Sequence, residues 1–397
     1  MKTMHRKLNY NHTLYACYLG YITQAIVNNF APLLFLTFAG AFDLTLDRIA
    51  LITTLNFATQ LIVDLVSVKY VDRIGYRFCV VAAHLFSVLG LVGLAFLPSL
   101  MGNPYAGILL SVVLYAIGGG LIEVLISPIV EACPTERKEA AMSLLHSFYC
   151  WGHVGVILLS TLFFRIAGIA HWRVLAVLWA LVPFANAFLF ARVPILSVTG
   201  DAEPLSLKEL ISSRLFWLFM LIMVCAGASE HSMSQWASAY AESALGVSKT
   251  IGDLAGPGGF AFLMGTSRAL YGKYSEKVPL RTAMALSALL CIVSYALAAL
   301  THSPLYGLLG CALCGFSVGL FWPGTFSLMA VRMPGAGTAM YALMALAGDA
   351  GCSLGPTVVG FAANAMNGSL KAGLVYAMIF PALIIIGIAA MKRTDRV

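Results

Sequence analysis

Residues 78–98 read FCVVAAHLFSVLGLVGLAFLP, a stretch of 21 residues without a charged side chain. A helix needs about 20 mostly apolar residues to cross the roughly 30 Å hydrocarbon core of a bilayer. This stretch therefore predicts a membrane-spanning helix. Eleven comparable stretches flank it, at residues 12–39, 48–68, 104–131, 139–164, 172–192, 214–243, 254–272, 280–300, 304–331, 336–361 and 370–391.

The composition of the whole chain supports a membrane protein. Of 397 residues, 60% are hydrophobic and only 10% are charged, whereas an average soluble protein carries roughly 25% charged residues. So few charges cannot give a soluble protein of this size a polar surface, which excludes a soluble enzyme, a nucleic-acid binder and a disordered chain. The net charge of +7 does not indicate nucleic acid, because the basic residues are scattered among short loops. The long unbroken runs also differ from the alternating segments of a β-barrel, so we expect an all-α membrane protein.

Charge and polarity predict the orientation and the division of the chain. With both termini in the cytoplasm, 18 of the 24 lysines and arginines lie on the inner side and five on the outer side, with Arg268 inside a span. Cytoplasmic loops carry such an excess, so we expect both termini inside. The longest polar stretch separates two sets of six spans. It predicts an N-terminal six-helix bundle (1–193), a cytoplasmic linker (194–213) and a C-terminal six-helix bundle (214–397).

Two loops repeat a pattern of charge. Residues 69–77 read KYVDRIGYR and residues 272–281 read GKYSEKVPLR. In each, an acid precedes a base and an arginine follows four residues later: Asp72, Arg73 and Arg77 in the first loop, Glu276, Lys277 and Arg281 in the second. A second echo pairs GLIE at 120–123 with GLFW at 319–322. A duplicated six-helix unit explains both echoes, and such repeats place a substrate site at their interface near the bilayer midplane.

The two loops resemble the signature Gly-x-x-x-Asp-Arg-x-Gly-Arg-Arg/Lys of the major facilitator superfamily. The first loop departs from it at Val68, and the second has Glu276 in place of Asp and lacks the second glycine. The resemblance implies the major facilitator fold, with twelve transmembrane helices in two six-helix bundles. The charged residues of the two loops can form a latch that gates the cytoplasmic face. The alternative is that they only anchor the inner ends of the helices.

A finer resemblance lies in the predicted span at 104–131. Residues 118–130, GGGLIEVLISPIV, look like the Gly-x-x-x-Glu-x-x-x-Asn-Pro stretch of the L-fucose permease branch, a family of sugar–proton symporters. There the glutamate is protonatable, which implies that Glu123 couples proton and solute. Two departures weaken the likeness to L-fucose itself. Ser127 replaces the asparagine, and Asn28 or Asn29 stands near the place of an acid in the first span.

Carboxyl groups inside predicted spans need a reason, because an ionisable group at mid-bilayer is costly. Burial disfavours the charged form, so Glu123 can bind a proton on one side and release it on the other. We assign Glu230 to proton coupling or substrate binding. Asp349 either contacts substrate or braces its own span, and Asp64 is interpreted as structural. The alternative for Glu123 is a permanently protonated or paired structural residue.

Polar and aromatic side chains within the spans predict the ligand. Amides and carboxylates can pair with hydroxyl groups, and indole rings can cover the apolar face of a sugar. Polar groups also join helices and aromatic groups mark membrane interfaces, which is the alternative for each. Apart from Arg268, no cation lies deep in a span, whereas an anion carrier needs a cationic clamp. The predicted substrate-binding residues are Gln24, Asn28, His153, Glu230, Gln235, Trp236, Trp322 and Asp349.

Together these features predict a secondary transporter that imports a small neutral solute, a monosaccharide or polyol, with protons by alternating access. We expect a monomer in the bacterial cytoplasmic membrane, with no cofactor, metal site or nucleic-acid partner. The alternatives are an exporter of organic cations or drugs in exchange for protons, and a receptor or scaffold without turnover. No nucleophile–base pair or metal-ligand spacing indicates an enzyme. The CxxC pair Cys311 and Cys314 lies in an apolar run and is interpreted as packing.

Overall fold

The computed structural model describes residues 8–134, 138–196, 211–274, 278–333 and 337–394, and within these ranges the regular structure is helical. The first half comprises α1 (Tyr10–Asn29), η1 (Ala31–Leu34), α2 (Phe35–Phe42), α3 (Leu46–Ile74), α4 (Tyr76–Leu100), α5 (Pro104–Ala132), α6 (Lys138–Ala167), η2 (Ile169–His171) and α7 (Trp172–Arg192). The second half comprises α9 (Arg214–Ser234), α10 (Ala237–Leu245), α11 (Lys249–Asp253), η3 (Leu254–Gly258), α12 (Gly259–Tyr274), α13 (Leu280–Leu300), α14 (Pro304–Val318), α15 (Phe321–Arg332), α16 (Gly337–Ala365), α17 (Leu370–Ala377) and α18 (Ile379–Thr394).

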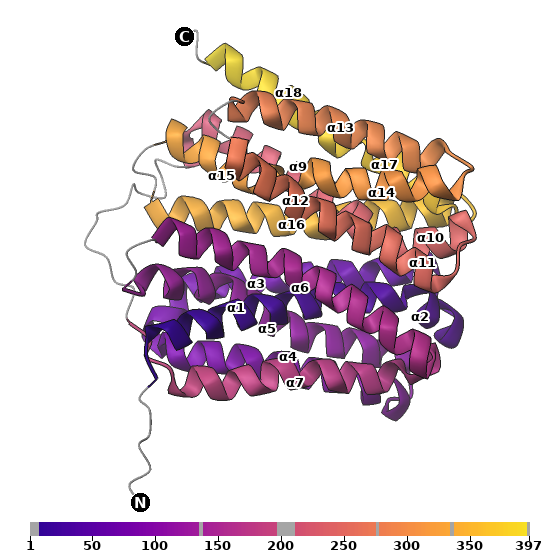
Figure 1. Ribbon diagram of the computed structural model, residues 1–397, viewed down its shortest axis with the longest axis horizontal. Helices are drawn as coiled ribbons and strands as arrows, with labels where there is room; N and C mark the ends of the chain where they lie inside the picture. The colour runs from indigo at the N-terminus through magenta and orange to yellow at the C-terminus, as the bar shows by residue number, and fades with distance from the viewer. Residues whose placement is uncertain (1–7, 135–137, 197–210, 275–277, 334–336, 395–397) are drawn as a thin grey trace, which may run out of the picture.

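The helices run side by side and form two adjoining bundles, one from each half of the chain (Figure 1). Helix α3 of the first bundle packs against α16 of the second, and α6 packs against α12. Helix α1 begins and helix α18 ends at the same end of the bundles, called here the terminal end (Figure 1). The opposite, distal end holds α2, α10 and α11.

The described residues contain ten helical segments that are long and apolar enough to cross a membrane. Each coincides with a predicted span. The two other predicted spans, 254–272 and 336–361, are also helical, as η3 with α12 and as α16. Helix α12 has 16 residues, about 24 Å of helix, which is shorter than the hydrocarbon core. The all-helical membrane architecture is therefore confirmed, while the number twelve and the orientation remain predictions.

Glycines set the close approach of α9 and α16, which lies at the centre of the second bundle. A Cβ atom on Gly351 would overlap the carbonyl oxygen of Val224, and one on Gly227 would overlap that of Gly348. Small residues let helix backbones meet where no water drives them together. This packing carries Glu230 on α9 and Asp349 on α16 to the interior between the bundles.

Candidate functional site

Prolines interrupt two helices near the interface of the bundles. In an α-helix the carbonyl of one residue accepts the N–H of the residue four positions later. Pro32 stands four residues after Asn28, and Pro323 stands four residues after Gly319. Because proline has no N–H, both carbonyl oxygens are left without their helical partner. Helix α1 accordingly gives way to η1 after Asn29, and α14 ends just before Gly319.

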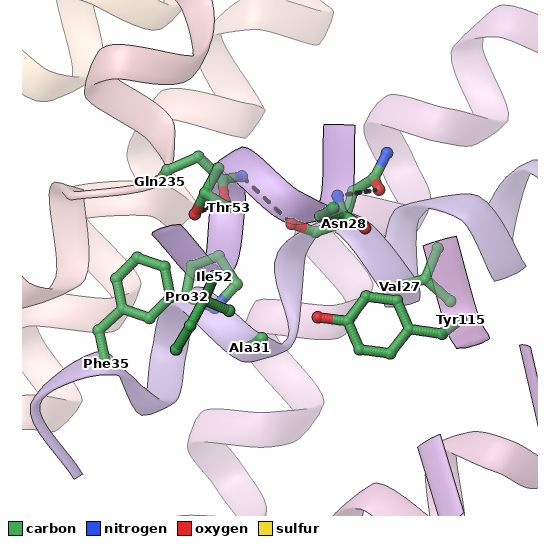
Figure 2. A pocket seen from close by; sticks show the side chains of 10 residues that line it. Val27, Asn28, Ala31, Pro32, Phe35, Ile52, Thr53, Tyr115 and Gln235 are labelled. Atoms are coloured by element: carbon green, nitrogen blue, oxygen red, sulfur yellow. Dashed lines mark hydrogen bonds between the residues drawn. The ribbon is translucent and has the colours of Figure 1, made fainter. Parts of the chain in front are cut away.

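Each freed carbonyl accepts a side-chain hydrogen bond from another helix. Gln235, at the break between α9 and α10, donates its Nε2 to the Asn28 oxygen at 3.1 Å. Its Oε1 accepts from the Thr53 hydroxyl at 3.3 Å. Figure 2 shows Gln235 reaching across from the second half to Asn28 of the first. On α12, Arg268 donates its Nε to the Gly319 oxygen at 3.1 Å. These breaks thus act as acceptors for inter-helix contacts.

A small pocket lies beside the Asn28–Gln235 contact (Figure 2). Its cavity volume is about 10 Å³, about the room that one water molecule needs and far below the roughly 300–1,000 Å³ of typical small-molecule sites. The pocket is therefore too small for a complete drug-sized site, and forms one part of the polar interior. Its lining is Val27, Asn28, Ala31, Pro32, Phe35, Ile52, Thr53, Asn56, Tyr115 and Gln235.

Neutral amides gather around Asn28. The Asn28 Oδ1 atom accepts from Asn56 Nδ2 at 3.1 Å and from Gln60 Nε2 at 2.8 Å. Asn56 and Gln60 are four residues apart on α3 and so share one face. All three side chains are buried, with at most 4% exposed. The Oδ1 of Asn56 and the Oε1 of Gln60 have no hydrogen-bond partner among the described residues, so acceptors remain free here.

Glu123 faces a neutral partner in the interior. Its Oε2 accepts from Gln24 Nε2 on α1 at 2.6 Å, and the residue is only partly exposed. One turn further along α5, Ser127 exchanges a hydrogen bond with Tyr21 at 3.0 Å. An amide partner can donate to a carboxylate or accept from a protonated carboxyl. Glu123 is thus neither turned outward nor fixed in one charge state by a cation.

Two further carboxyl groups come close to Glu123. Asp64 on α3 and Asp349 on α16 interact with one another, and each acts electrostatically on Glu123 or is acted on by it. Asp64 is 6% exposed and Asp349 is 2% exposed. Sequence reasoning gave Asp64 a structural role and did not place it near Asp349. The spacing of Asn56, Gln60 and Asp64 on one face of α3 was the available signal.

Glu230 and Arg268 belong to a second polar region in the other bundle. Glu230 is 5% exposed, and its Oε2 has no hydrogen-bond partner among the described atoms. Arg268 interacts with it electrostatically. The arginine also donates from Nη1 to the Cys150 sulfur on α6 at 3.1 Å. Arg268 therefore contacts the first bundle, which its position in the sequence did not indicate.

Helix α6 contributes two histidines and a tyrosine. His153 is buried and its Nδ1 has no partner among the described groups. Tyr149 lies near Asn29, whose Nδ2 donates to the phenolic oxygen at 3.5 Å. His146 is exposed, although its ring lies against Tyr21, with ring centroids 5.4 Å apart.

The two predicted aromatic contacts occupy different environments. Trp236 is fully buried at the α9–α10 break, and its Nε1 donates to the Pro356 carbonyl on α16 at 3.0 Å. Trp322 on α15 is partly exposed and packs directly on Gly348, next to Asp349. Trp236 thus joins helices in this conformation, while Trp322 keeps an accessible face. Ligand contact remains a prediction for both.

The predicted gating arginines contact their own bundles. Arg77 donates from Nη1 to the Phe190 and Ala191 carbonyls at the end of α7, each at 3.0 Å. Arg281 donates from Nη2 to the Ile388 carbonyl on α18 at 2.9 Å. Each arginine thus holds the last helix of its own half. Arg73 is exposed. Glu276, Lys277 and the side chain of Asp72 lie outside the described residues, so the gating role remains a prediction.

A lysine crosses between the bundles at the distal end. Lys249 Nζ on α11 donates to the Leu33 carbonyl of η1 at 2.6 Å. The same ammonium forms ion pairs with Glu242 and Asp253, each at 3.2 Å. Asp253 also accepts from Ser238 at 2.5 Å. This network, together with the Gln235–Asn28 bond, joins the two bundles at the distal end.

Within the described ranges, no group of three or more His, Cys, Asp or Glu side chains is arranged to hold a metal ion. What the arrangement offers instead is a set of buried carboxyl and amide groups between two bundles. Such an interface between repeated halves defines the class of secondary membrane transporters.

Comparison with known proteins gives the family. The model of the Major Facilitator Superfamily matches residues 17–356. The chain therefore belongs to the major facilitator superfamily, whose members are transporters rather than enzymes. No curated protein matches the chain as a relative.

Solved structures share the fold. The chain is similar to a bacterial homologue of the human lysosomal transporter Spinster in an inward-facing and occupied conformation, with 15% identity, a TM-score of 0.72, and coverage of 98% of this chain and 97% of that one. It is also similar to the E. coli fucose:proton symporter FucP, with 16% identity, a TM-score of 0.65, and coverage of 95% and 97%. A structure of the transporter FucP in the outward conformation is also similar, with 18% identity, a TM-score of 0.62, and coverage of 95% of this chain and 97% of that one.

Proposed function

We propose that this transporter imports a small neutral solute, a monosaccharide or polyol, together with protons. The observation that carries the proposal is the bond from Gln24 to Glu123. The Oε1 of Gln24 is buried and has no partner among the described residues, so it can accept from Glu123 once that carboxyl is protonated. The amide serves both protonation states, as a proton carrier requires.

The ligand class follows from the neutral amides beside Glu123. Free acceptor oxygens on Asn56 and Gln60 suit the hydroxyl groups of a sugar or polyol. Asn28, Gln235 and Trp322 would complete the site, with His153 and Glu230 facing it from the other helices. The similarity to a fucose:proton symporter supports this class, although at 16% identity it supports the fold first.

We further propose twelve spans with both termini in the cytoplasm of a bacterial cell, and a monomer as the working form. The basic residues support this orientation. The Lys249 network and the Gln235–Asn28 bond then join the two bundles at the outer end. We infer from these outer contacts that the conformation is inward-facing, and we propose that alternating access occurs by rocking of the two bundles.

The experiment that tests the coupling is Glu123→Gln in proteoliposomes. The glutamine keeps the shape and the bond to Gln24 but cannot release a proton. We expect solute counterflow to continue while accumulation driven by a pH gradient is lost. The natural protein with a protonophore gives the matched control for lost coupling. Accumulation that survives the substitution would exclude Glu123 as the proton carrier.

A second candidate is an exporter of organic cations. The observation that favours it is the group Asp64, Glu123 and Asp349, whose described electrostatic partners are acids rather than cations. A cation can neutralise such a group as a proton does. A thermal-shift screen of sugars, polyols and lipophilic amines separates the two, because a ligand that binds the native state raises the melting temperature.

A further inference from the structure

Helices α3 and α16 meet in an antiparallel register that crosses the boundary between the two bundles. Thr54 and Thr357 exchange a hydroxyl hydrogen bond, and Ser353 Oγ donates to the Thr54 carbonyl at 3.2 Å. Along α3, residues after Thr54 lie progressively closer to the terminal end. Along α16, residues before Thr357 lie progressively closer to that same end.

This register brings two acids to the same height. Asp64 lies ten residues beyond Thr54, and Asp349 lies eight residues before Thr357. At 1.5 Å per residue these are displacements of about 15 Å and about 12 Å along the two helices. The carboxyl groups accordingly lie within interaction distance of one another. They form a pair in which each bundle supplies one member.

The carboxyl pair lacks donors. Both oxygens of Asp64 and the Oδ2 of Asp349 are buried without a hydrogen-bond partner among the described residues. The nearest orphaned polar atom on α3, Gln60 Oε1, is an acceptor as well. Buried acceptors without donors are rare in native structures. One proton on either carboxyl would supply the missing donor and remove one of two like charges.

The surroundings do not provide a cation instead. Glu123 from α5 acts electrostatically on Asp349, and Cys352 from α16 interacts with Asp349 as well. The buried Arg268 on α12 interacts with Glu230 and Cys150 instead. Basic groups on other neighbouring helices have partners elsewhere: Arg77 on the α7 carbonyls, His84 on Val80 and Asn186, and Lys371 on the Thr301 carbonyl. Two ionised carboxylates at this depth would repel one another without compensation.

We propose that Asp64 and Asp349 form a second proton-binding site, in which one shared proton holds α3 against α16. When the carboxylic O–H releases its proton to water, two carboxylates remain and their repulsion separates the helices. The inward-facing contact therefore persists at low pH and weakens as pH rises. The inference extends the proposed function by adding a second proton-binding site near Glu123. The carboxyl pair itself is defined by the contact between α3 and α16 and requires no solute.

The test reads helix separation without transport. Spin labels on Thr45→Cys and Asn364→Cys report the exposed distal ends of α3 and α16 in lipid nanodiscs, since the nine native cysteines are buried. We expect the distance distribution to shift as pH is raised in the natural background. Asp64→Asn and Asp349→Asn should each abolish the shift, because a single carboxyl beside an amide has no like charge to meet. Asp43→Asn, an exposed acid at the distal end, should keep it.

A second measurement covers variants that fold poorly. Infrared difference spectra of the natural protein between low and high pH should lose a protonated carboxyl band, and Asp349→Glu should move that band. Unchanged pH-dependent distances in both Asn variants, or no carboxyl band assignable to the pair, would overturn the proposal. So would a shift driven by sodium at fixed pH. Because no solute is present, failure of sugar uptake leaves this result intact.

Discussion

Gln235 joins the two bundles through a carbonyl oxygen that Pro32 leaves free. A buried hydrogen bond contributes roughly 0.5–1.5 kcal/mol net, and an acceptor left unsatisfied costs about 1–3 kcal/mol. Gln235→Leu removes the bonds to Asn28 and Thr53 together. We expect the distal end to open about tenfold more often, since about 1.4 kcal/mol corresponds to a factor of ten. The reaction rate of Ala31→Cys, behind this bond, with an impermeant thiol reagent measures the opening.

The matched control for Gln235 is Ser243→Ala. The Ser243 hydroxyl donates to Ala239 within its own helix, so its loss should leave the thiol reaction unchanged. Thr53→Val removes only the weaker of the two Gln235 bonds and should give an intermediate rate. If Gln235→Leu reacts no faster than the natural protein, the bond does not hold the distal end closed.

Lys249 gives a prediction that depends on pH. Burial raises the pKa of the Asp253 carboxyl above its ordinary value, and the Lys249 ammonium partly offsets that shift. An acid with a raised pKa stabilises the fold below its ordinary titration range and loses that contribution as pH rises. Lys249→Gln removes the offset, so ionised Asp253 is left buried without its cation. We expect the melting temperature of this variant to fall further below the natural one as pH rises from acid to neutral.

The double variant Lys249→Gln with Asp253→Asn is the control. It has no carboxyl to ionise at this position, so its melting temperature relative to the natural protein should vary less with pH. Equal pH profiles for the single and double variants would show that Asp253 is not the responsible group.

The interruption of α1 before Pro32 can be tested directly. Proline in a helix interior costs about 3 kcal/mol relative to alanine, so Pro32→Ala should let α1 continue through η1. The Asn28 carbonyl would then accept from the new N–H rather than from Gln235. We expect a melting temperature equal to or above the natural one, together with slower transport. Melting curves and initial uptake rates in the same preparation measure both.

Pro183→Ala serves as the comparison for Pro32→Ala. Pro183 lies inside α7, away from the interface between the bundles, so its loss should stabilise the protein without slowing transport. Transport that slows equally in both variants would mean that the break in α1 has no special role.

The helices themselves could be predicted from hydropathy, because most of them contain an unbroken run of about 20 mostly apolar residues. Their interruptions could be predicted only in part. Pro32 and Pro323 predict the helix breaks next to them. The break at Gln235 has no proline and lies where Trp236 packs against α16, so the sequence does not predict it. The polar residues Gln24, Asn28 and Glu123 could be chosen from their depth. Their hydrogen-bond partners could not be predicted, because those partners lie on other helices. The same holds for Asp64, whose neighbour Asp349 is far away in the sequence.

For the molecule as a whole, alternating access requires α3 and α16 to move relative to one another. Thr54→Cys with Thr357→Cys places two thiols where two hydroxyl groups now meet. We expect oxidation to lock the bundles and to abolish uptake, and reduction to restore it. Solute flux before oxidation, after oxidation and after reduction checks the prediction.

The natural protein supplies the control for oxidation. Cys291 and Cys314 lie 4.0 Å apart within the second bundle, so a bond between them would not join the two halves. Uptake by the natural protein under the same oxidant should persist. Uptake by the oxidised double variant at the natural rate would show that these helices need not separate during transport.

Arg77 and Arg281, each in the first turn of the third long helix of its half (α4 and α13), bind carbonyl groups of the final helix of that half. Both sets of hydrogen bonds lie within one half of the chain, so each bundle is stabilised by contacts of its own. Severing the covalent link between the bundles would then cost little internal order. Two polypeptides made separately, one ending after α7 and one beginning at α9, should find each other in the bilayer and recover activity.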